Sequence, residues 1–350
     1  MPMLSILAAI TMTLSSAAAD PLPVRGLHLF APGPSEVART VDFIKQALPK
    51  EGVNTLILEF DFAYQFKKRP EMVDDNALSH DQMRQLSAAC KEAKVRLIPQ
   101  INLLGHQSWA KRNGKLLREH PEFDETPGKY PDNKDIYCRS YCPNHPKVHD
   151  VLFDCIDELV EACEADAFHV GMDEVFIIGD KDCARCKDKS AADLFAGEVN
   201  KLHGHLKSKG IEMWMWGDRF LEGSTTGLGE WEAATNKTEG ALGKIPKDIV
   251  ICDWHYEKAE PTAPFFAMNG FRVASCPWRQ IPVAMGQLSI INNVRANANK
   301  TLAGRMVGMI HTTWNGAGAF IDGYNGVGTP SKEVQESVAC FKELFKAIRG

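Results

Sequence analysis

The sequence has no excess of basic residues, no internal repeat, no low-complexity segment and only one long uninterrupted apolar run. Its 350 residues include 40 Lys and Arg against 45 Asp and Glu, a formal net charge of -5. This balance offers no positive surface for a phosphate backbone, so we expect no nucleic-acid partner. The apolar run is shorter than the about 20 residues of a membrane-spanning helix, so we expect no membrane partner either.

The composition is that of a folded globular protein, with 44% hydrophobic and 24% charged residues. At about 150 residues per domain, the length alone allows one large domain or two small ones.

The long apolar run lies at the amino terminus, over residues 4–14, and is followed by SSAAAD. Ala17 and Ala19 frame a cleavage site of the small-residue kind. No Lys or Arg precedes the run, and a buried amino-terminal helix is the alternative. We predict a signal peptide over residues 1–19 and an exported protein, periplasmic or extracellular, whose mature chain begins near Asp20.

Eight short runs with β character recur along the chain, and most are continuously apolar. They start at Val24, Val53, Val95, Ala167, Ile211, Asp248, Phe271 and Met306. Continuous apolar runs are typical of strands buried on both faces, as in a parallel sheet.

Helical patterns lie between these runs, over residues 34–48, 79–94, 145–164 and 191–209. Ser35 is the predicted N-cap of the first, and Gly52, Gly210 and Gly270 suit the left-handed position at helix ends. Eight strand-then-helix units predict an α/β fold, a single (β/α)8 TIM barrel over residues 20–350. The chain exceeds the ~250 residues of a typical barrel, and we assign most of the surplus to a long loop from about Leu103 to Cys142, after the third strand.

In such a barrel the active site lies at the carboxyl ends of the strands. The residues at or near the run ends are Arg25, Glu59, Asp61, His106, Asp173, Glu174, Trp216, Asp218, Asp253, Trp254, Tyr256, Trp278, Arg279, His311, Trp314 and Asn315. Four of the seven tryptophans fall in this set. Aromatic faces stack on sugar rings and carboxylates bind hydroxyls, so the set indicates a carbohydrate site; the alternative is that the tryptophans only fill the barrel mouth as hydrophobic bulk.

Asp173 and Glu174 are adjacent, and neighbours on a strand point in opposite directions. They therefore do not face each other across one sugar as acid and nucleophile unless the chain bends. Substrate-assisted hydrolysis avoids this difficulty, because the 2-acetamido oxygen of the substrate attacks. Asp173 would then orient the acetamido group and Glu174 would act as general acid and later as base.

At these residues the sequence resembles glycoside hydrolase family 20, the β-N-acetylhexosaminidases. The family motif His-x-Gly-x-Asp-Glu reads His169-Val-Gly171-Met-Asp173-Glu174, and three further blocks match, at 24–26, at 98–106, and at 214–218 with 253–254. The resemblance implies hydrolysis of 2-acetamido sugar glycosides, with Asp173 orienting the acetamido group and Glu174 as acid/base. The predicted substrate-binding residues are Arg25, His106, His169, Trp216, Asp218, Trp254, Tyr256, Trp278 and Trp314.

The chain departs from the family pattern at several positions. Gln100 and Leu104 stand where the family usually has Glu and Pro, and Asn315 stands where it often has a Glu after the last strand. The family's acetamido-binding Tyr has no clear counterpart, and Tyr256 or Trp278 are the candidates to replace it. The separate small domain that often precedes the barrel has no room here.

Two other functions compete with glycoside hydrolysis. A metal-dependent barrel hydrolase would use the histidines near strand ends, which are His28, His106, His169, His255 and His311. The H-x-H spacing typical of such sites occurs only at His203 and His205, in a predicted outer helix, so we expect no catalytic metal and no cofactor. Instead we expect His106 and His169 to orient the two carboxylates, unless His169 is a core histidine. A non-catalytic carbohydrate-binding barrel is the other alternative, although it would not need the retained acid.

Ten cysteines remain to be explained. Cys183-Ala-Arg-Cys186 has the C-x-x-C spacing of a metal knuckle, and a zinc site with nearby Cys138, Cys142, His145 and His149 is one possibility. Disulfides are the other, and the sequence leaves both open. Cys252 and Cys276 lie in apolar runs and are expected to be core residues.

Overall fold

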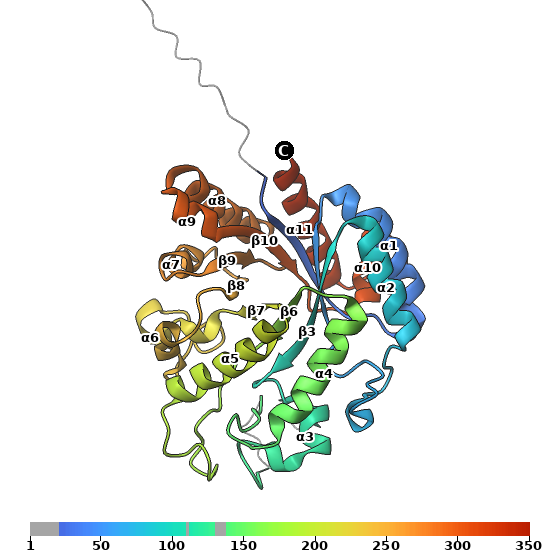
Figure 1. Cartoon of the computed structure of the whole chain (residues 1–350). Coiled ribbons are helices and arrows are strands. Elements are labelled where there is room, and N and C mark those ends of the chain that lie inside the picture. Colours follow the sequence, from blue (N-terminus) through green and yellow to red (C-terminus); the bar gives the residue numbers. More distant parts are fainter. Residues whose placement is uncertain (1–20, 110–111, 130–137) are drawn as a thin grey trace, which may run out of the picture.

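The computed structural model describes residues 21–109, 112–129 and 138–350, and it shows a closed barrel of parallel strands surrounded by helices (Figure 1). The eight strands are β1 (Val24–Phe30), β2 (Thr55–Glu59), β3 (Arg96–Leu103), β6 (Ala167–Gly171), β7 (Glu212–Trp216), β8 (Val250–Trp254), β9 (Arg272–Cys276) and β10 (Met306–Thr312). They follow in sequence order around the barrel, and β10 pairs with β1 to close it. The predicted (β/α)8 barrel is confirmed.

Helices α1 to α11 cover the outside of the strands or lie in the loops. They are α1 (Val37–Glu51), α2 (His80–Ala93), α3 (Lys115–Glu119), α4 (Val148–Cys163), α5 (Ala191–Ser208), α6 (Gly223–Thr226), α7 (Thr262–Met268), α8 (Ile281–Asn297), α9 (Lys300–Arg305), α10 (Ala317–Asn325) and α11 (Lys332–Arg349). Short 3-10 turns lie at η1 (Pro34–Glu36), η2 (Pro70–Met72), η3 (Pro121–Phe123), η4 (Asp218–Phe220) and η5 (Thr238–Lys244). None of the helices in the described ranges has the length and apolarity needed to cross a bilayer.

The continuous apolar character of the strands reflects burial on both faces, since every residue of β2, β6, β8 and β10 is buried. Alternate residues belong to different cores. Met213 and Met215 of β7 pack in the large core shared with the helices, whereas Trp214 and Trp216 belong to a second cluster inside the barrel. Large side chains therefore fill the barrel beneath its mouth.

Most of the expected helix boundaries are confirmed. Ser79 caps α2 through a capping box with Gln82, and Gly52, Gly210 and Gly270 all have positive φ. The prediction of Ser35 as an N-cap is wrong, because the chain first makes the 3-10 turn η1, which starts after Gly33.

The long loop after β3 is confirmed and carries structure of its own. It includes the two-stranded sheet of β4 (Ser108–Trp109) and β5 (Arg112–Asn113), followed by α3 and η3. Arg139 is buried in this loop and contacts the Asp124 carboxylate at 2.7 Å. The predicted signal peptide, residues 1–19, lies outside the described residues.

Candidate active site

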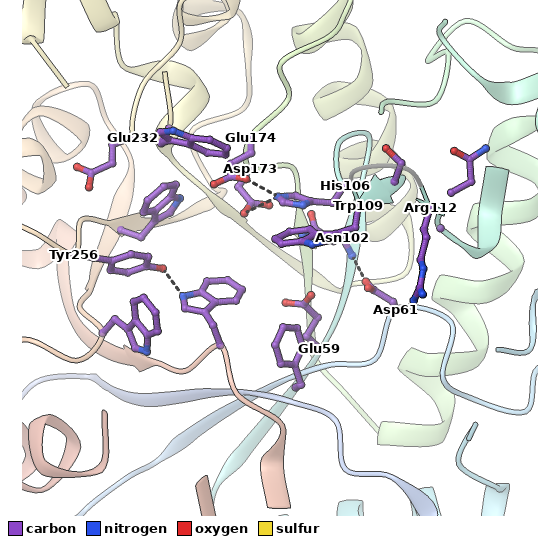
Figure 2. Close-up of a pocket in the computed structure, with 18 of the residues that line it drawn as sticks. Glu59, Asp61, Asn102, His106, Trp109, Arg112, Asp173, Glu174, Glu232 and Tyr256 are labelled. Atoms are coloured by element: carbon purple, nitrogen blue, oxygen red, sulfur yellow. Dashed lines mark hydrogen bonds and ion pairs between the residues drawn. The ribbon is translucent and has the colours of Figure 1, made fainter. Parts of the chain in front are cut away.

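A cavity of about 750 Å³ opens at the carboxyl ends of the strands. Acidic, aromatic and amide side chains line it, and Figure 2 shows most of them facing a common space. The lining consists of Phe30, Glu59, Asp61, Asn102, His106, Ser108, Trp109, Arg112, Asn113, Gly114, Asp173, Glu174, Trp231, Glu232, Trp254, Tyr256, Glu257, Trp278 and Trp314.

Asp173 and Glu174 both face this cavity because the backbone turns sharply after β6. Gly171, Met172 and Glu174 have φ values of 65°, 67° and 49°, in the left-handed region. The alternation of side chains along the strand therefore ends at Gly171. The chain bends at this point, which is the condition expected from the sequence for both carboxyl groups to face one site. Glycine is required at that position, since a Cβ would come within 2.7 Å of the Asn102 Cα.

The His106 ring lies beside the two carboxyl groups and contacts both through one nitrogen (Figure 2). Its Nε2 is 3.4 Å from Asp173 Oδ2 and 3.3 Å from Glu174 Oε2. Its Nδ1 lies 3.5 Å from Cys138 Sγ. Burial works against protonation of the ring, yet the Asp173 charge raises the pKa of His106 well above its ordinary value.

The two carboxyl groups differ in protonation. Burial, followed by the charge of Asp173, raises the pKa of Glu174 to about 8, so that Glu174 is a neutral acid at pH 7. Burial would also raise the pKa of Asp173, but the charge and hydrogen bond of His106 outweigh it and hold the pKa below its usual value. The pair therefore presents one carboxylate and one carboxylic acid, which is the division of roles that acid catalysis needs.

Aromatic side chains at or just after the carboxyl ends of β8, β9 and β10 form one wall of the cavity. Trp254 and Tyr256 are stacked with their ring centres 5.0 Å apart. Trp314 Nε1 donates a hydrogen bond to the Tyr256 hydroxyl oxygen at 2.9 Å. Trp278 packs edge-on against Tyr256. These rings offer flat apolar surfaces next to polar groups, as binding of a sugar ring requires.

The chain matches the family model described as glycosyl hydrolase family 20, catalytic domain, over residues 57–313. This match covers more than half of the chain and includes both carboxylates. The chain belongs to glycosyl hydrolase family 20.

Solved structures with the same fold agree with this family. A Flavobacterium johnsoniae chitobiase shares 18% identity at a TM-score of 0.65, with 94% of this chain covered and 51% of the other. A Vibrio harveyi GH20 exo-β-N-acetylglucosaminidase in complex with N-acetylglucosamine shares 14% identity at a TM-score of 0.60, with 93% of this chain covered and 54% of the other. Dispersin B shares 15% identity at a TM-score of 0.52, with 92% of this chain covered and 97% of the other. The chain thus spans about half the length of the Flavobacterium johnsoniae chitobiase. Comparison with curated proteins gives no match.

Of the family 20 site residues predicted from the sequence, seven meet in the cavity: His106, Asp173, Glu174, Trp254, Tyr256, Trp278 and Trp314. Asp218 lies behind them, fully buried. Its Oδ2 accepts hydrogen bonds from the Glu174 backbone N–H at 3.0 Å and from Arg219 at 2.6 Å. Its Oδ1 accepts one from Trp254 Nε1 at 3.3 Å. Asp218 therefore positions cavity residues and does not line the cavity itself.

Trp216 and His169 lie below the cavity, inside the barrel. Trp216 is fully buried against the rings of His28, His169 and Trp314. Trp216, predicted to bind substrate, does not line the cavity and instead supports its floor from below. No hydrogen bond joins His169 to Asp173 or Glu174 among the described residues; its Nδ1 accepts the Gly171 N–H at 3.1 Å. Burial lowers the pKa of His169 well below its ordinary value, so it is a neutral core histidine.

Arg25 lies at the wrong end of the barrel to bind substrate. It is near the start of β1, where its Nε donates to the Gly52 carbonyl at 2.8 Å and its Nη1 to the Leu22 carbonyl at 2.7 Å. The residue of β1 that lines the cavity is Phe30, at the carboxyl end of the strand. The prediction that Arg25 clamps the sugar is therefore wrong, because parallel strands present only their carboxyl ends to the active-site face.

Several cavity residues were absent from the predicted set. Glu59 and Asp61 were among the strand-end residues but not among the predicted substrate-binding residues. Glu59 Oε2 accepts from Gln100 Nε2 at 2.6 Å and lies 3.1 Å from His28 Nε2. Asp61 accepts the backbone N–H of Asn102 at 2.8 Å, and burial followed by the Glu59 charge raises its pKa to about 7.

Other unpredicted cavity residues come from the loops that follow the strands. Trp109 and Arg112 lie in the small sheet after β3, and Trp231 and Glu232 lie in the loop after β7. Trp109 and Trp231 are 61% and 46% exposed at the cavity. No strand-end pattern marks these positions; only the presence of tryptophan outside any apolar run could have indicated them.

The histidines considered for a catalytic metal do not converge in the described part of the chain. His28 pairs with Glu59, His255 with Glu232 and His311 with Ser337. Two groups of donor atoms are close enough to hold an ion: His106, Cys138 and Glu174 in the cavity, and Glu125, Cys142, Cys183 and Cys186 outside it. In the first group, the closeness of the donor atoms is explained by the contacts of His106 with Cys138 and the two carboxyl groups.

Replacing His106 by Gln tests how the carboxylates are held. The amide keeps a hydrogen-bond donor near the position of Nε2 but removes the positive charge, so the pKa of Asp173 rises. We expect the acidic limb of the kcat/KM–pH profile to move to higher pH. At neutral pH kcat/KM should fall by about tenfold or less, since a hydrogen bond is retained. His120→Gln, outside the cavity, is the control, and an unmoved acidic limb would show that His106 does not set the charge of Asp173.

Proposed function

We propose that the chain hydrolyses β-linked N-acetylhexosamine residues by substrate-assisted, retaining catalysis. The observation that carries this proposal is the bend after β6, which points the side chains of both Asp173 and Glu174 into one cavity. There the pKa of Asp173 is lowered and that of Glu174 is raised, so one group is a carboxylate and the other a carboxylic acid. Two neighbouring residues on one turn cannot flank a sugar from opposite sides. A nucleophile supplied by the substrate removes the need for a second protein carboxylate on the far side.

In the proposed reaction Glu174 donates its proton to the glycosidic oxygen as the bond to the anomeric carbon breaks. The acetamido carbonyl oxygen attacks the anomeric carbon from the other face and forms a bicyclic oxazolinium intermediate. Asp173, held anionic by His106, accepts a hydrogen bond from the acetamido N–H and stabilises the positive charge. Glu174 then takes a proton from water, which opens the ring with overall retention of configuration.

Tyr256 is the proposed replacement for the acetamido-binding tyrosine of the family. Trp Nε1–H is a donor only, so the Tyr256 oxygen accepts from Trp314 and retains its own O–H as a donor. We propose that this O–H contacts the acetamido oxygen. Trp254, Trp278 and Trp314 then surround the apolar face of the sugar, and Glu59, Asp61 and Glu232 are available for its hydroxyls.

A panel of chromogenic β-glycosides tests the proposal. We expect cleavage of N-acetylglucosaminides or N-acetylgalactosaminides, and at least about 10³-fold slower cleavage of the matching glucoside, which has no internal nucleophile. A thiazoline analogue of the bicyclic intermediate should inhibit strongly. Binding of the acetamido sugar without any turnover would instead support the non-catalytic carbohydrate-binding barrel.

A further inference from the structure

A second polar cluster lies outside the cavity, where two long loops meet. Cys142 comes from the loop after β3, and Cys183 and Cys186 come from the loop between β6 and α5. Glu125 follows η3 in the first of these loops. All four residues are buried. One ligand atom from each lies within 4.8 Å of the others, although 61 positions separate the first from the last along the sequence.

The spacing of the thiols fits a tetrahedral metal ion. Cys142 Sγ is 3.5 Å from both Cys186 Sγ and Cys183 Sγ. Two sulfurs bound to zinc at 2.3 Å with a tetrahedral angle lie about 3.8 Å apart. The thiols therefore already stand close to the edge length of a zinc coordination sphere, with Glu125 at the remaining corner.

Glu125 provides a second, independent observation. Its Oε1 accepts the backbone N–H groups of Gly179 at 2.8 Å and Asp180 at 3.2 Å, which fix the carboxyl group. Its Oε2 is buried and has no hydrogen-bond partner among the described residues. A buried carboxylate oxygen without a partner is costly. A cation among the three sulfurs would satisfy it.

The local backbone also has the form of a metal knuckle. The N–H groups of Cys186 and Lys187 both donate to the Cys183 carbonyl, at 3.2 and 3.0 Å, and make a tight turn over the C-x-x-C segment. Asn144 Nδ2 lies 3.4 Å from Cys186 Sγ, where it donates to the sulfur. Donors of this kind stabilise sulfur in its thiolate form and orient it towards a metal.

We propose that Glu125, Cys142, Cys183 and Cys186 bind one structural zinc ion. Sulfur and carboxylate ligands fill all four positions, so no site remains for a substrate, and none of the four residues lines the cavity. A disulfide would use only two of the three thiols and leave the third thiol and Glu125 unsatisfied. Of the partners considered from the sequence, Cys138 contacts His106, and His149 binds Glu198.

The zinc ion would join the loop that carries His106 to the loop that carries Asp173 and Glu174. His106 must stay within about 3.4 Å of both carboxylates to set their charges. Each of these loops is long, and a shared metal removes much of their freedom to move apart. The site therefore stabilises the geometry of the cavity from outside it, whichever glycoside the cavity accepts.

Metal analysis of the full-length chain purified without chelator tests the proposal. We expect about one zinc per chain by plasma mass spectrometry, and ten reactive thiols after denaturation with a chelator. Cys186→Ser should reduce the zinc content to about a tenth or less, whereas Cys340→Ala, a buried cysteine in α11, should retain it. A metal-free protein with eight reactive thiols would overturn the proposal in favour of a disulfide.

Two further measurements do not depend on the cysteine variants folding. Cobalt exchanged into the native chain should give the thiolate charge-transfer band and visible d–d bands of a tetrahedral sulfur site. Glu125→Gln, which keeps all three thiols, should release zinc to a chromogenic chelator faster than the native chain. A protein that takes up no cobalt, and whose melting temperature does not change with chelator, would contradict a bound structural metal. Neither readout requires glycosidase activity.

Discussion

The Glu174→Gln variant should lose about 10³-fold in kcat/KM towards a β-N-acetylglucosaminide. Glutamine keeps the size of the side chain, but its amide has no acidic proton to transfer to the glycosidic oxygen. The loss should be smaller for a 4-nitrophenyl glycoside, whose leaving group departs without much protonation, than for a disaccharide, whose leaving alcohol needs the proton. Rates on both substrates for the native and variant chains measure this difference.

The pH profile gives the same residue a second, independent signature. Because the pKa of Glu174 is raised to about 8, the acid is protonated below that pH and is lost above it. Native kcat/KM should therefore fall as the pH rises through about 8, and the variant should lack this limb. Asp166→Asn, which removes an exposed carboxylate at the opposite end of the barrel, is the matched control and should keep native rates. Equal rates in the native and Glu174→Gln chains would refute the assignment of Glu174 as the acid.

The Asp173→Asn variant should lose about 10² to 10³-fold in kcat towards the same substrate. Asparagine cannot provide the negative charge that stabilises the oxazolinium. A thiazoline inhibitor, which resembles that intermediate, should lose affinity by a similar factor. Steady-state kinetics and inhibitor titration measure both effects.

Asp173→Asn should also move the basic limb of the pH profile. The Asp173 charge contributes to the raised pKa of Glu174, so its removal lowers that pKa and activity should fall at lower pH than in the native chain. The direction separates the electrostatic role of Asp173 from a merely structural one, since a general loss of packing would reduce rates without this shift. A variant with native kcat and only a higher KM would contradict substrate assistance.

The barrel could be predicted because its signal is local and repeated. Each strand is a continuous apolar run that ends in polar or aromatic residues, and each helix has its own periodicity and end signals. Register and closure then follow from connecting eight such units. The His169 to Glu174 motif was equally local, and it predicted the two carboxyl groups that the structure brings into the cavity.

Arg25 and Trp216 show what a local pattern does not contain. Both lie in a β run, but the distance of each from the barrel mouth depends on where its strand starts and on what fills the interior. Trp216 points inward as alternation requires, yet Trp314 and Trp254 reach the cavity and Trp216 remains below it.

The sequence by itself determined the barrel, the family and the two carboxylates, because periodicity and a contiguous motif encode them. Only the tertiary structure decided how the chain bends after β6, and that His106 contacts both Asp173 and Glu174. It alone joined Glu125 to the three cysteines. The protonation of Glu174 and the donor set of the proposed zinc site depend on burial and on distances across loops, and the order of residues along one segment does not fix either of them.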